Sequence, residues 1–300
     1  MTTKNTLKLE VPAGFKFWPT VNSHGWPQLL PFTRDDNDRT ISTTARLSSG
    51  RVVRFTCLES REKLRVNALA ESKLSVSERR ELAEIISYML SLDLSLDSFY
   101  QAVSKQKHLR WIAEGEWGRF LRSATLFEDV VKVIMTTNCN WAQTKNMVAR
   151  SVELLGAPFP PEPTYKAFPL PEQFKEAGEK FLAEKIRVGY RAQAIIECAE
   201  RFLAGEFDLD HISKLDSAQL FKKFKSLRGA GDYAAGMLTI LLGHFDYIPV
   251  DSWMTAQAAK KYFNGTEVTR AQIEELYRKW GPWRGLVAWF DVNEEYFRLK

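Results

Sequence analysis

The sequence predicts an α+β fold, in which an N-terminal antiparallel β domain with helices precedes a mainly helical domain. Two observations carry this prediction. The first 75 residues hold short segments in which apolar and polar residues alternate, as in half-buried strands. After Gly118 the chain shows a succession of helical periodicities with capping residues between them. We therefore expect two domains, over residues 1–117 and 118–300.

The N-terminal segment supplies the predicted sheet. Ser48–Gly50 is a good hairpin turn, and the loops 15–19 and 25–27 are rich in aromatic residues, which we expect to cover the sheet. Helical periodicity follows over residues 77–92, with shorter helices predicted over 94–104 and 108–114. The strand candidates are Thr6–Val11, Thr40–Leu47, Arg51–Leu58 and Lys63–Ala70.

The bulk composition narrows the class of protein without defining it. The chain has 300 residues, 45% hydrophobic content and a net charge of +5, which permits a polyanionic partner but does not require one. Cys57, Cys139 and Cys198 are too far apart for a disulfide framework or a zinc motif, and too few for an iron–sulfur cluster. The sequence shows no signal peptide and no apolar stretch of membrane-spanning length, so we expect a cytoplasmic protein without a membrane partner.

The stretch 227–253 organises the second half of the chain. Asp216–Gln219 is a capping box that opens a helix, and Leu227–Gly231 is a turn for small residues. Asp232 is expected to cap the next helix, which places Tyr233 and Met237 on one face. A helix, a Gly-x-Gly hairpin and a second helix form the typical clamp for DNA phosphates, here through Arg228, Gly229, Ala230 and Gly231.

Asp251 follows an extended segment, Tyr247–Val250, and begins another helix. As a helix N-cap it would stabilise the protein by roughly 0.5–2 kcal/mol. A carboxylate at this position could also stabilise positive charge in a reaction. The two roles are compatible, because a capping aspartate is ionised and held in place.

This order of parts resembles the helix-hairpin-helix (HhH-GPD) DNA glycosylase superfamily, and most closely the branch of the AlkA-type and 8-oxoguanine glycosylases. The resemblance extends through Leu126–Gly156, Gly189–Ala194 and Trp280–Gly285. It implies that Asp251 is catalytic and stabilises the sugar cation formed as the N-glycosidic bond breaks. The base pocket that it implies contains Tyr233, Met237, Trp253, Ala288 and Trp289, and the antiparallel N-terminal domain is expected to help wall it.

The resemblance also implies a set of residues for base extrusion and for the opposite strand, namely Asn138, Asn140, Gln143, Tyr190 and Arg191. Of these, Asn138, Tyr190 and Arg191 resemble the 8-oxoguanine branch. From the residues alone, helix capping explains Asn138 and Asn140 equally well, and amphipathic packing explains Tyr190 and Arg191. The tryptophans after residue 252 could likewise fill the core or stack on a flipped base.

Several positions depart from the family pattern. Tyr233 stands where the strand-cleaving members carry a lysine, and a phenol cannot form a Schiff base. In the 8-oxoguanine branch a Gln reads the flipped base at the position of Ala288. An opposite-strand Arg of that branch is replaced here by Gln143, and a His by Trp253. The family hairpin also holds a monovalent cation, Na⁺ or K⁺, through backbone carbonyls that correspond to Lys225, Leu227 and Ala230; no other cofactor is expected.

Together these features predict a monofunctional DNA glycosylase of base-excision repair. It would act as a monomer on double-stranded DNA that contains a damaged base, with alkylated purines such as 3-methyladenine as substrates, and would be associated with the nucleoid in a bacterium. The alternatives are a glycosylase for oxidised or deaminated bases, a non-catalytic helix-hairpin-helix DNA-binding protein, and a protein-binding helical domain without DNA affinity.

Overall fold

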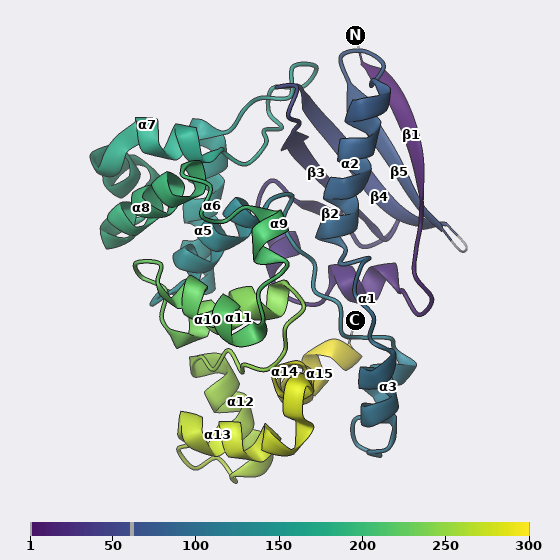
Figure 1. Cartoon of the computed structure of the whole chain (residues 1–300), viewed down its shortest axis with the longest axis vertical. Coiled ribbons are helices and arrows are strands. Elements are labelled where there is room, and N and C mark those ends of the chain that lie inside the picture. The colour runs from purple at the N-terminus through teal and green to yellow at the C-terminus, as the bar shows by residue number, and fades with distance from the viewer. Residues whose placement is uncertain (1, 61–62, 300) are drawn as a thin grey trace.

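The α+β class is confirmed. A computed structural model describes residues 2–60 and 63–299, and its N-terminal part is a five-stranded antiparallel sheet with the order β1-β5-β4-β3-β2 (Figure 1). The strands are β1 Thr3–Glu10, β2 Thr33–Asp35, β3 Thr40–Arg46, β4 Val52–Ser60 and β5 Lys63–Ala70. Each of the four predicted strands is present within a few residues of its expected bounds. The short β2 was missed because Thr33–Asp35 carries no apolar alternation.

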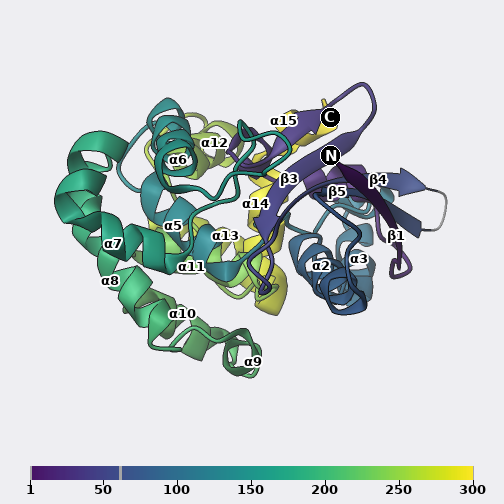
Figure 2. The ribbon, with the colours of Figure 1, turned by 90° about the horizontal axis from the view of Figure 1, so that it is seen from above.

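The sheet buries one face through side chains that alternate along its central strands. Val66 in β5 is fully buried and pairs with Leu7 on one side and with Cys57 on the other. The helix α2, Val76–Met89, opens with a capping box at Ser75 and lies across the sheet, as Figures 1 and 2 show. Burial of its apolar stripe, which includes Leu82, fixes the helix there.

The remaining helices form the body that stands beside and below the sheet in Figure 1. The short elements are α1 Phe17–Val21, η1 Trp26–Gln28, α3 Asp97–Ser104, α4 Arg110–Glu114, η2 Leu182–Ile186, η3 Gly189–Arg191, α9 Leu209–Ile212, η4 Arg278–Trp283 and α15 Glu294–Arg298. The longer ones are α5 Leu126–Thr136, α6 Trp141–Leu155, α7 Pro171–Phe181, α8 Ala192–Leu203, α10 Ser217–Lys225, α11 Asp232–Leu241, α12 Ser252–Tyr262, α13 Arg270–Tyr277 and α14 Arg284–Val292.

The N-terminal and C-terminal parts share their apolar packing. Trp111 and Trp117, from the segment around α4, contact the rings of Phe290 in α14 and Phe297 in α15. Residues from β1 to α15 belong to one hydrophobic cluster. A domain boundary at Gly118 stays a prediction, but any such boundary is bridged by close packing of aromatic side chains.

The capping prediction for Asp232 is wrong. The N-cap of α11 is Gly231, and Asp232 lies in the first turn of that helix. Its carboxylate contacts Lys225 Nζ at 2.5 Å and Arg270 at 3.4 Å, and these charges lower the pKa of Asp232. An acidic residue in the first turn complements the helix dipole, so Asp232 still stabilises the start of α11 although it is not the N-cap.

Within the described residues, none of the helices has the length and apolar character needed to cross a membrane.

Candidate active site

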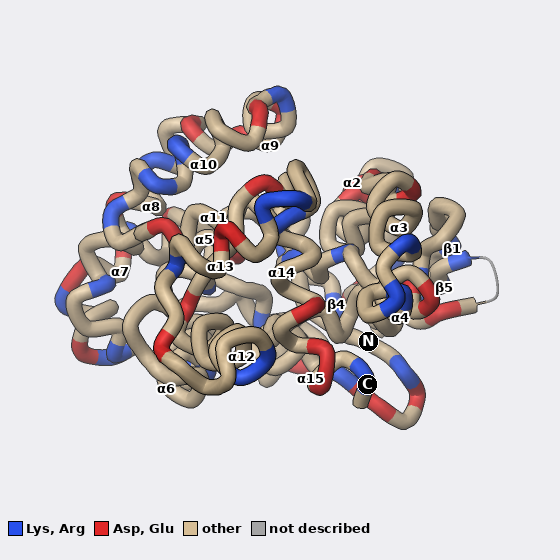
Figure 3. The backbone as a smooth tube through the Cα atoms, turned by 90° about the horizontal axis from the view of Figure 1, so that it is seen from below, with Lys and Arg blue, Asp and Glu red and all other residues tan. Residues whose placement is uncertain are grey.

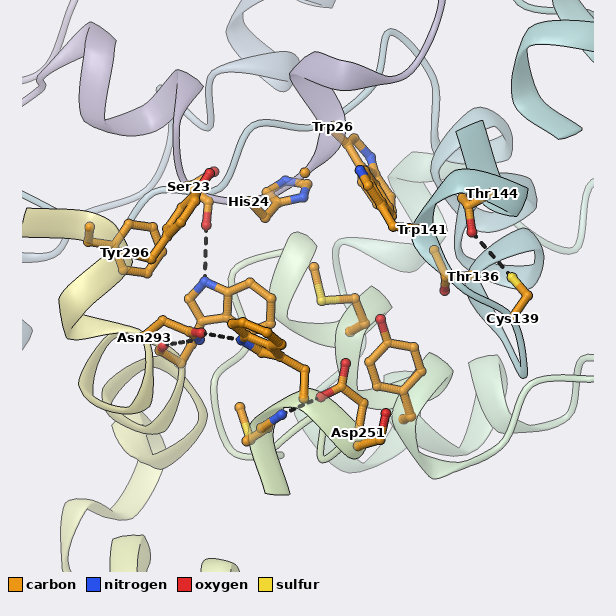
Figure 4. A pocket seen from close by; sticks show the side chains of 18 residues that line it. Ser23, His24, Trp26, Thr136, Cys139, Trp141, Thr144, Asp251, Asn293 and Tyr296 are labelled. Carbon is orange, nitrogen blue, oxygen red and sulfur yellow. Dashed lines mark hydrogen bonds between the residues drawn. The ribbon is translucent and has the colours of Figure 1, made fainter. Parts of the chain in front are cut away.

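A pocket of about 560 Å³ lies where the N-terminal loop before η1 meets α11, α12 and the end of α14 (Figure 4). Asp251 is on one wall, and Ser23, His24 and Trp26 are on the opposite wall. The pocket therefore joins segments from both ends of the chain. It is lined by Ser23, His24, Gly25, Trp26, Thr136, Cys139, Trp141, Thr144, Tyr233, Met237, Asp251, Ser252, Trp253, Met254, Trp289, Asn293, Tyr296 and Phe297.

Asp251 is the N-cap of α12, as the sequence predicts, and it also faces this pocket. Its Oδ1 accepts a hydrogen bond from the backbone N–H of Met254 at 2.7 Å. Burial raises the pKa of Asp251 above its ordinary value of 3.8, while backbone hydrogen bonds to Met254 and Trp253 act in the opposite direction. The result is a rigid carboxylate that is partly withdrawn from water. Among the lining residues that the structure describes, Asp251 is the only acidic one.

The extended segment before Asp251 packs against two glycines, Gly236 and Gly285. A Cβ atom on Gly285 would lie 2.1 Å from the carbonyl oxygen of Tyr247, and the Gly285 N–H donates to Phe245 O at 2.8 Å. On the other side, a Cβ on Gly236 would lie 3.5 Å from Pro249 Cα. The segment thus runs between α11 and α14 at a distance that only glycine permits at position 285, and this fixes where Asp251 emerges.

No residue of the loop Ser23–Trp26 was predicted as a site residue, although the family resemblance implies that the N-terminal domain helps to wall the base pocket. Ser23 Oγ accepts from the Leu121 N–H at 3.0 Å, and Trp26 Nε1 donates to Asp129 Oδ1 at 2.7 Å. These contacts tie the loop to the segment before α5 and to α5 itself. From the residues alone, the aromatic side chains here were expected to cover the sheet, whereas Trp26 lines the pocket. The signal that could have shown this is the tryptophan between Gly25 and Pro27, in a segment with no helical or strand period.

His24 is a neutral imidazole in this wall. Burial lowers the pKa of His24 to about 4, and the positive charge of Lys132 adds to the effect. Its Nε2 lies 2.7 Å from the Leu121 carbonyl oxygen, which can only accept, so Nε2 carries the proton. Nδ1 is then a hydrogen-bond acceptor, and it is buried without a partner among the described residues.

Four tryptophans form the aromatic walls, and the protein fixes the orientation of each. Trp141 Nε1 donates to Gln28 Oε1 at 2.9 Å, Trp253 Nε1 to Asn293 Oδ1 at 2.7 Å, and Trp289 Nε1 to Ser23 O at 3.0 Å. Trp26 makes the bond to Asp129 described above. Because the indole N–H groups are used within the protein, the rings offer apolar surface to the pocket rather than hydrogen bonds.

The predicted pocket residues fall into two groups. Tyr233, Met237, Trp253 and Trp289 line the pocket. Ala288 does not: it is 0% exposed in the core, so its assignment to the pocket is wrong. Successive residues of a helix point about 100° apart, and α14 directs Trp289 to the pocket and Ala288 into the interior.

Tyr233 lies on α11 near Asp251. Burial raises the pKa of Tyr233 to about 12, and the negative charge of Asp251 contributes to this shift. The side chain is therefore a neutral phenol at pH 7. It can form part of the pocket wall but cannot act as an amine nucleophile.

A second, more polar hollow of about 370 Å³ collects the residues assigned to extrusion and the opposite strand. Asn138, Gln143, Tyr190 and Arg191 line it, and Cys139 lines both this hollow and the aromatic pocket, so the two are adjacent. Asn140 is not a lining residue of either; its side chain caps α6 by accepting from the Gln143 N–H at 2.9 Å.

Within this hollow Tyr190 and Arg191 differ in accessibility. The Tyr190 side chain is 69% exposed, and its hydroxyl accepts from Asn138 Nδ2 at 3.3 Å. Arg191 is buried, donates to the backbone carbonyl of Thr137, and lies with its guanidinium 4.6 Å from the centre of the Tyr190 ring. Arg191 thus packs its guanidinium against the ring of the exposed tyrosine.

The hairpin between α10 and α11 is a tight turn with a glycine at a positive φ. Gly229 has φ +79°, a conformation that favours glycine, and the Ala230 N–H donates to Leu227 O at 3.0 Å. Arg228 is exposed, and α10 ends with Lys222, Lys223 and Lys225, which appear as blue segments on α10 in Figure 3. Gly231 has φ −79°, and a Cβ placed there would meet no atom within 4 Å, so nothing inside the protein requires glycine at this position.

The chain is similar in structure to solved DNA glycosylases. The 3-methyladenine DNA-glycosylase from Archaeoglobus fulgidus aligns with a TM-score of 0.76 at 19% identity, over 97% of this chain and 99% of that one. The Clostridium acetobutylicum 8-oxoguanine glycosylase/lyase, in complex with DNA containing cytosine opposite 8-oxoguanine, gives 0.73 at 19% identity, over 100% and 99%. MBOgg1, in complex with a low-affinity DNA ligand, gives 0.72 at 20% identity, over 98% and 96%.

No protein-family model matches the sequence, and no curated protein matches it. At 19–20% identity the likeness to the solved structures establishes the fold. The chain has the fold of the helix-hairpin-helix DNA glycosylases, which confirms the architecture that the sequence resemblance implied.

Proposed function

We propose that this protein is a monofunctional DNA glycosylase that removes alkylated purines, such as 3-methyladenine, from double-stranded DNA in base-excision repair. The observation that carries the proposal is a single rigid carboxylate, Asp251, on the wall of an aromatic pocket large enough for a base. The adjacent hollow with the exposed Tyr190 supports the extrusion step.

The proposed mechanism depends on charge. As the N-glycosidic bond breaks, positive charge builds on the deoxyribose, and the Asp251 carboxylate stabilises it and orients the attacking water. Partial burial strengthens this interaction because less water screens it. Tyr233, at the position of the lysine in strand-cleaving members, supplies no amine, so the product is an intact abasic site.

Two features favour an alkylated base as the substrate. Alkylation at a ring nitrogen makes the base cationic, so it leaves without protonation, and Asp251 is the only acidic lining residue among those described. The faces of fixed tryptophans such as Trp253 and Trp289 attract an electron-poor cation.

An oxidised purine is the second candidate. Asn138, Tyr190 and Arg191 match the 8-oxoguanine branch, and solved structures of both types are similar to this chain. A non-catalytic DNA-binding protein with this fold is the third candidate, and Asp251 at the pocket argues against it.

DNA backbone binding is assigned to the hairpin, through Arg228, Gly229, Ala230 and Gly231. The family resemblance implies a Na⁺ or K⁺ ion on the carbonyls of Lys225, Leu227 and Ala230. Leu227 O accepts one hydrogen bond, from the Ala230 N–H, and keeps a second lone pair for such an ion. Its role would be to fix the hairpin N–H groups toward a phosphate. We further propose that the protein acts as a monomer in the cytoplasm, on the nucleoid in a bacterium.

The substrate assignment predicts that 3-methyladenine is released faster than 8-oxoguanine. The two rates should be measured under single-turnover conditions on one duplex framework, with thymine opposite the alkylated base and cytosine opposite 8-oxoguanine. Faster release of 8-oxoguanine would replace the substrate and leave the glycosylase assignment standing.

The hairpin assignment predicts that Gly231→Leu weakens binding to every DNA sequence to a similar degree, because phosphates carry no sequence information. The thermal midpoint should stay near that of the unmodified protein, since a side chain here meets no protein atom. Titrations of several duplexes at fixed salt measure this. The control is Ser213→Leu, in the exposed turn after α9. A glycine such as Gly265 is not used as the control because its φ of +79° would strain a leucine. Loss of affinity for one sequence only would contradict the assignment.

A further inference from the structure

A continuous path of hydrogen bonds connects the N-terminal loop to the first turn of α12. Ser23 O accepts from Trp289 Nε1 at 3.0 Å, Trp289 O accepts from Asn293 Nδ2 at 2.8 Å, and Asn293 Oδ1 accepts from Trp253 Nε1 at 2.7 Å. Figure 4 shows Asn293 at one side of the pocket, with dashed lines for these hydrogen bonds. Asn293 uses its amide oxygen and its amide nitrogen in this path.

Trp253 is the exposed end of the path. Its side chain is 59% exposed, which is unusual for a tryptophan that also lines a pocket. An exposed indole would ordinarily sample several rotamers, but the 2.7 Å bond to Asn293 holds this ring in one orientation. It stands two residues after Asp251, in the first turn of the same helix.

We propose that Asn293 is a positioning residue that holds Trp253 as a fixed aromatic rim, against which a cationic N-alkylated purine stacks when it enters the pocket. This inference rests on the proposed function and adds the residue that orients one of the aromatic rings proposed to attract a charged base. A pre-oriented ring loses little freedom on binding, so more of the stacking energy appears as affinity. A cation over a tryptophan face gains more than a neutral base of the same shape.

The path also explains why the rim can remain rigid while exposed. Its other end is the loop Ser23–Trp26, which is anchored to the segment before α5. Asn293 lies in the turn between α14 and α15, and its side chain satisfies groups on both α12 and α14. Removal of the amide would release Trp253 without removing the ring.

The test is a double-mutant cycle of Asn293→Leu and Trp253→Leu. Excision of 7-methylguanine, whose nucleoside is cationic, should be compared with excision of neutral hypoxanthine on one duplex framework. Each single variant should lower the ratio of the two rates by roughly 3- to 30-fold, the range expected for loss of a cation–π contact. The double variant should lower it no further, because both changes remove the same contact. Asn67→Leu, on the exposed side of β5, is the matched control and should leave the ratio unchanged.

A measurement without catalysis separates this inference from the proposed function. The unmodified protein and the variants should be titrated calorimetrically with 3,9-dimethyladeninium, a fixed cation, and with neutral 9-methyladenine. We expect the unmodified protein to prefer the cation and both single variants to lose that preference, even if it releases no base from any duplex. Additive effects in the cycle, an unchanged preference in Asn293→Leu, or no preference in the unmodified protein would each overturn the inference.

Discussion

Asp251→Asn should lower single-turnover base release by at least about a hundredfold, in line with the loss of one preorganised electrostatic group, while DNA binding persists. The carboxylate charge, and not its shape, stabilises the sugar cation in the proposed mechanism. Asparagine is as good an N-cap as aspartate, so the hydrogen bond from Met254 N–H and the start of α12 should survive. The folded protein is thus changed in charge alone.

Asp208→Asn is a matched control for this variant. Asp208 also caps a helix, by accepting from the His211 N–H at 3.1 Å, and it does not line the pocket. It should retain full activity. Release by Asp251→Asn within about tenfold of the unmodified rate, which corresponds to roughly 1.4 kcal/mol, would contradict the catalytic role.

The acid limb of the pH–rate profile should lie at higher pH than for an ordinary aspartate. Burial raises the pKa of Asp251, and the ionised carboxylate is the active form, so activity is lost as the pH falls through this raised pKa.

Tyr190→Ala should slow excision from duplex DNA by about tenfold or more and slow excision from single strands far less. Unstacking a paired base costs a few kcal/mol, and an inserted side chain offsets part of this cost. This role agrees with the 69% exposure of Tyr190 and with its two contacts, a ring contact with the Arg191 guanidinium and a hydrogen bond from Asn138.

Parallel single-turnover measurements on the two substrates check the prediction. Leu203→Ala, a substitution of an exposed apolar residue outside the hollow, should affect neither substrate. Equal slowing of duplex and single-strand excision by Tyr190→Ala would assign Tyr190 to the pocket rather than to extrusion.

Local patterns predict the parts of this fold that depend on local interactions. The strands β3–β5, the capping box at Asp216 and the N-caps at Asn140 and Asp251 follow from alternation and from polar residues at helix starts. The hairpin between α10 and α11 follows because Gly229 needs a positive φ, which few other residues adopt.

Contacts between distant segments are the parts that local patterns miss. Ser23 and His24 reach the pocket through bonds to Leu121, about a hundred residues later, and Asn293 reaches it through Trp253. Asp232 was misassigned because its partners, Lys225 and Arg270, come from two other helices. No period or capping rule carries such information.

The central claim is that the pocket around Asp251 releases a damaged base by hydrolysis. Its most direct test is product analysis after incubation of excess protein with a duplex that carries one 3-methyladenine, with borohydride present in a parallel reaction. The account predicts free 3-methyladenine, a strand that stays intact until alkali cleaves it at the abasic site, and no covalent protein–DNA adduct. Absence of free base from this duplex and from duplexes with other lesions, while salt-dependent DNA binding persists, would contradict it and indicate a non-catalytic DNA-binding protein.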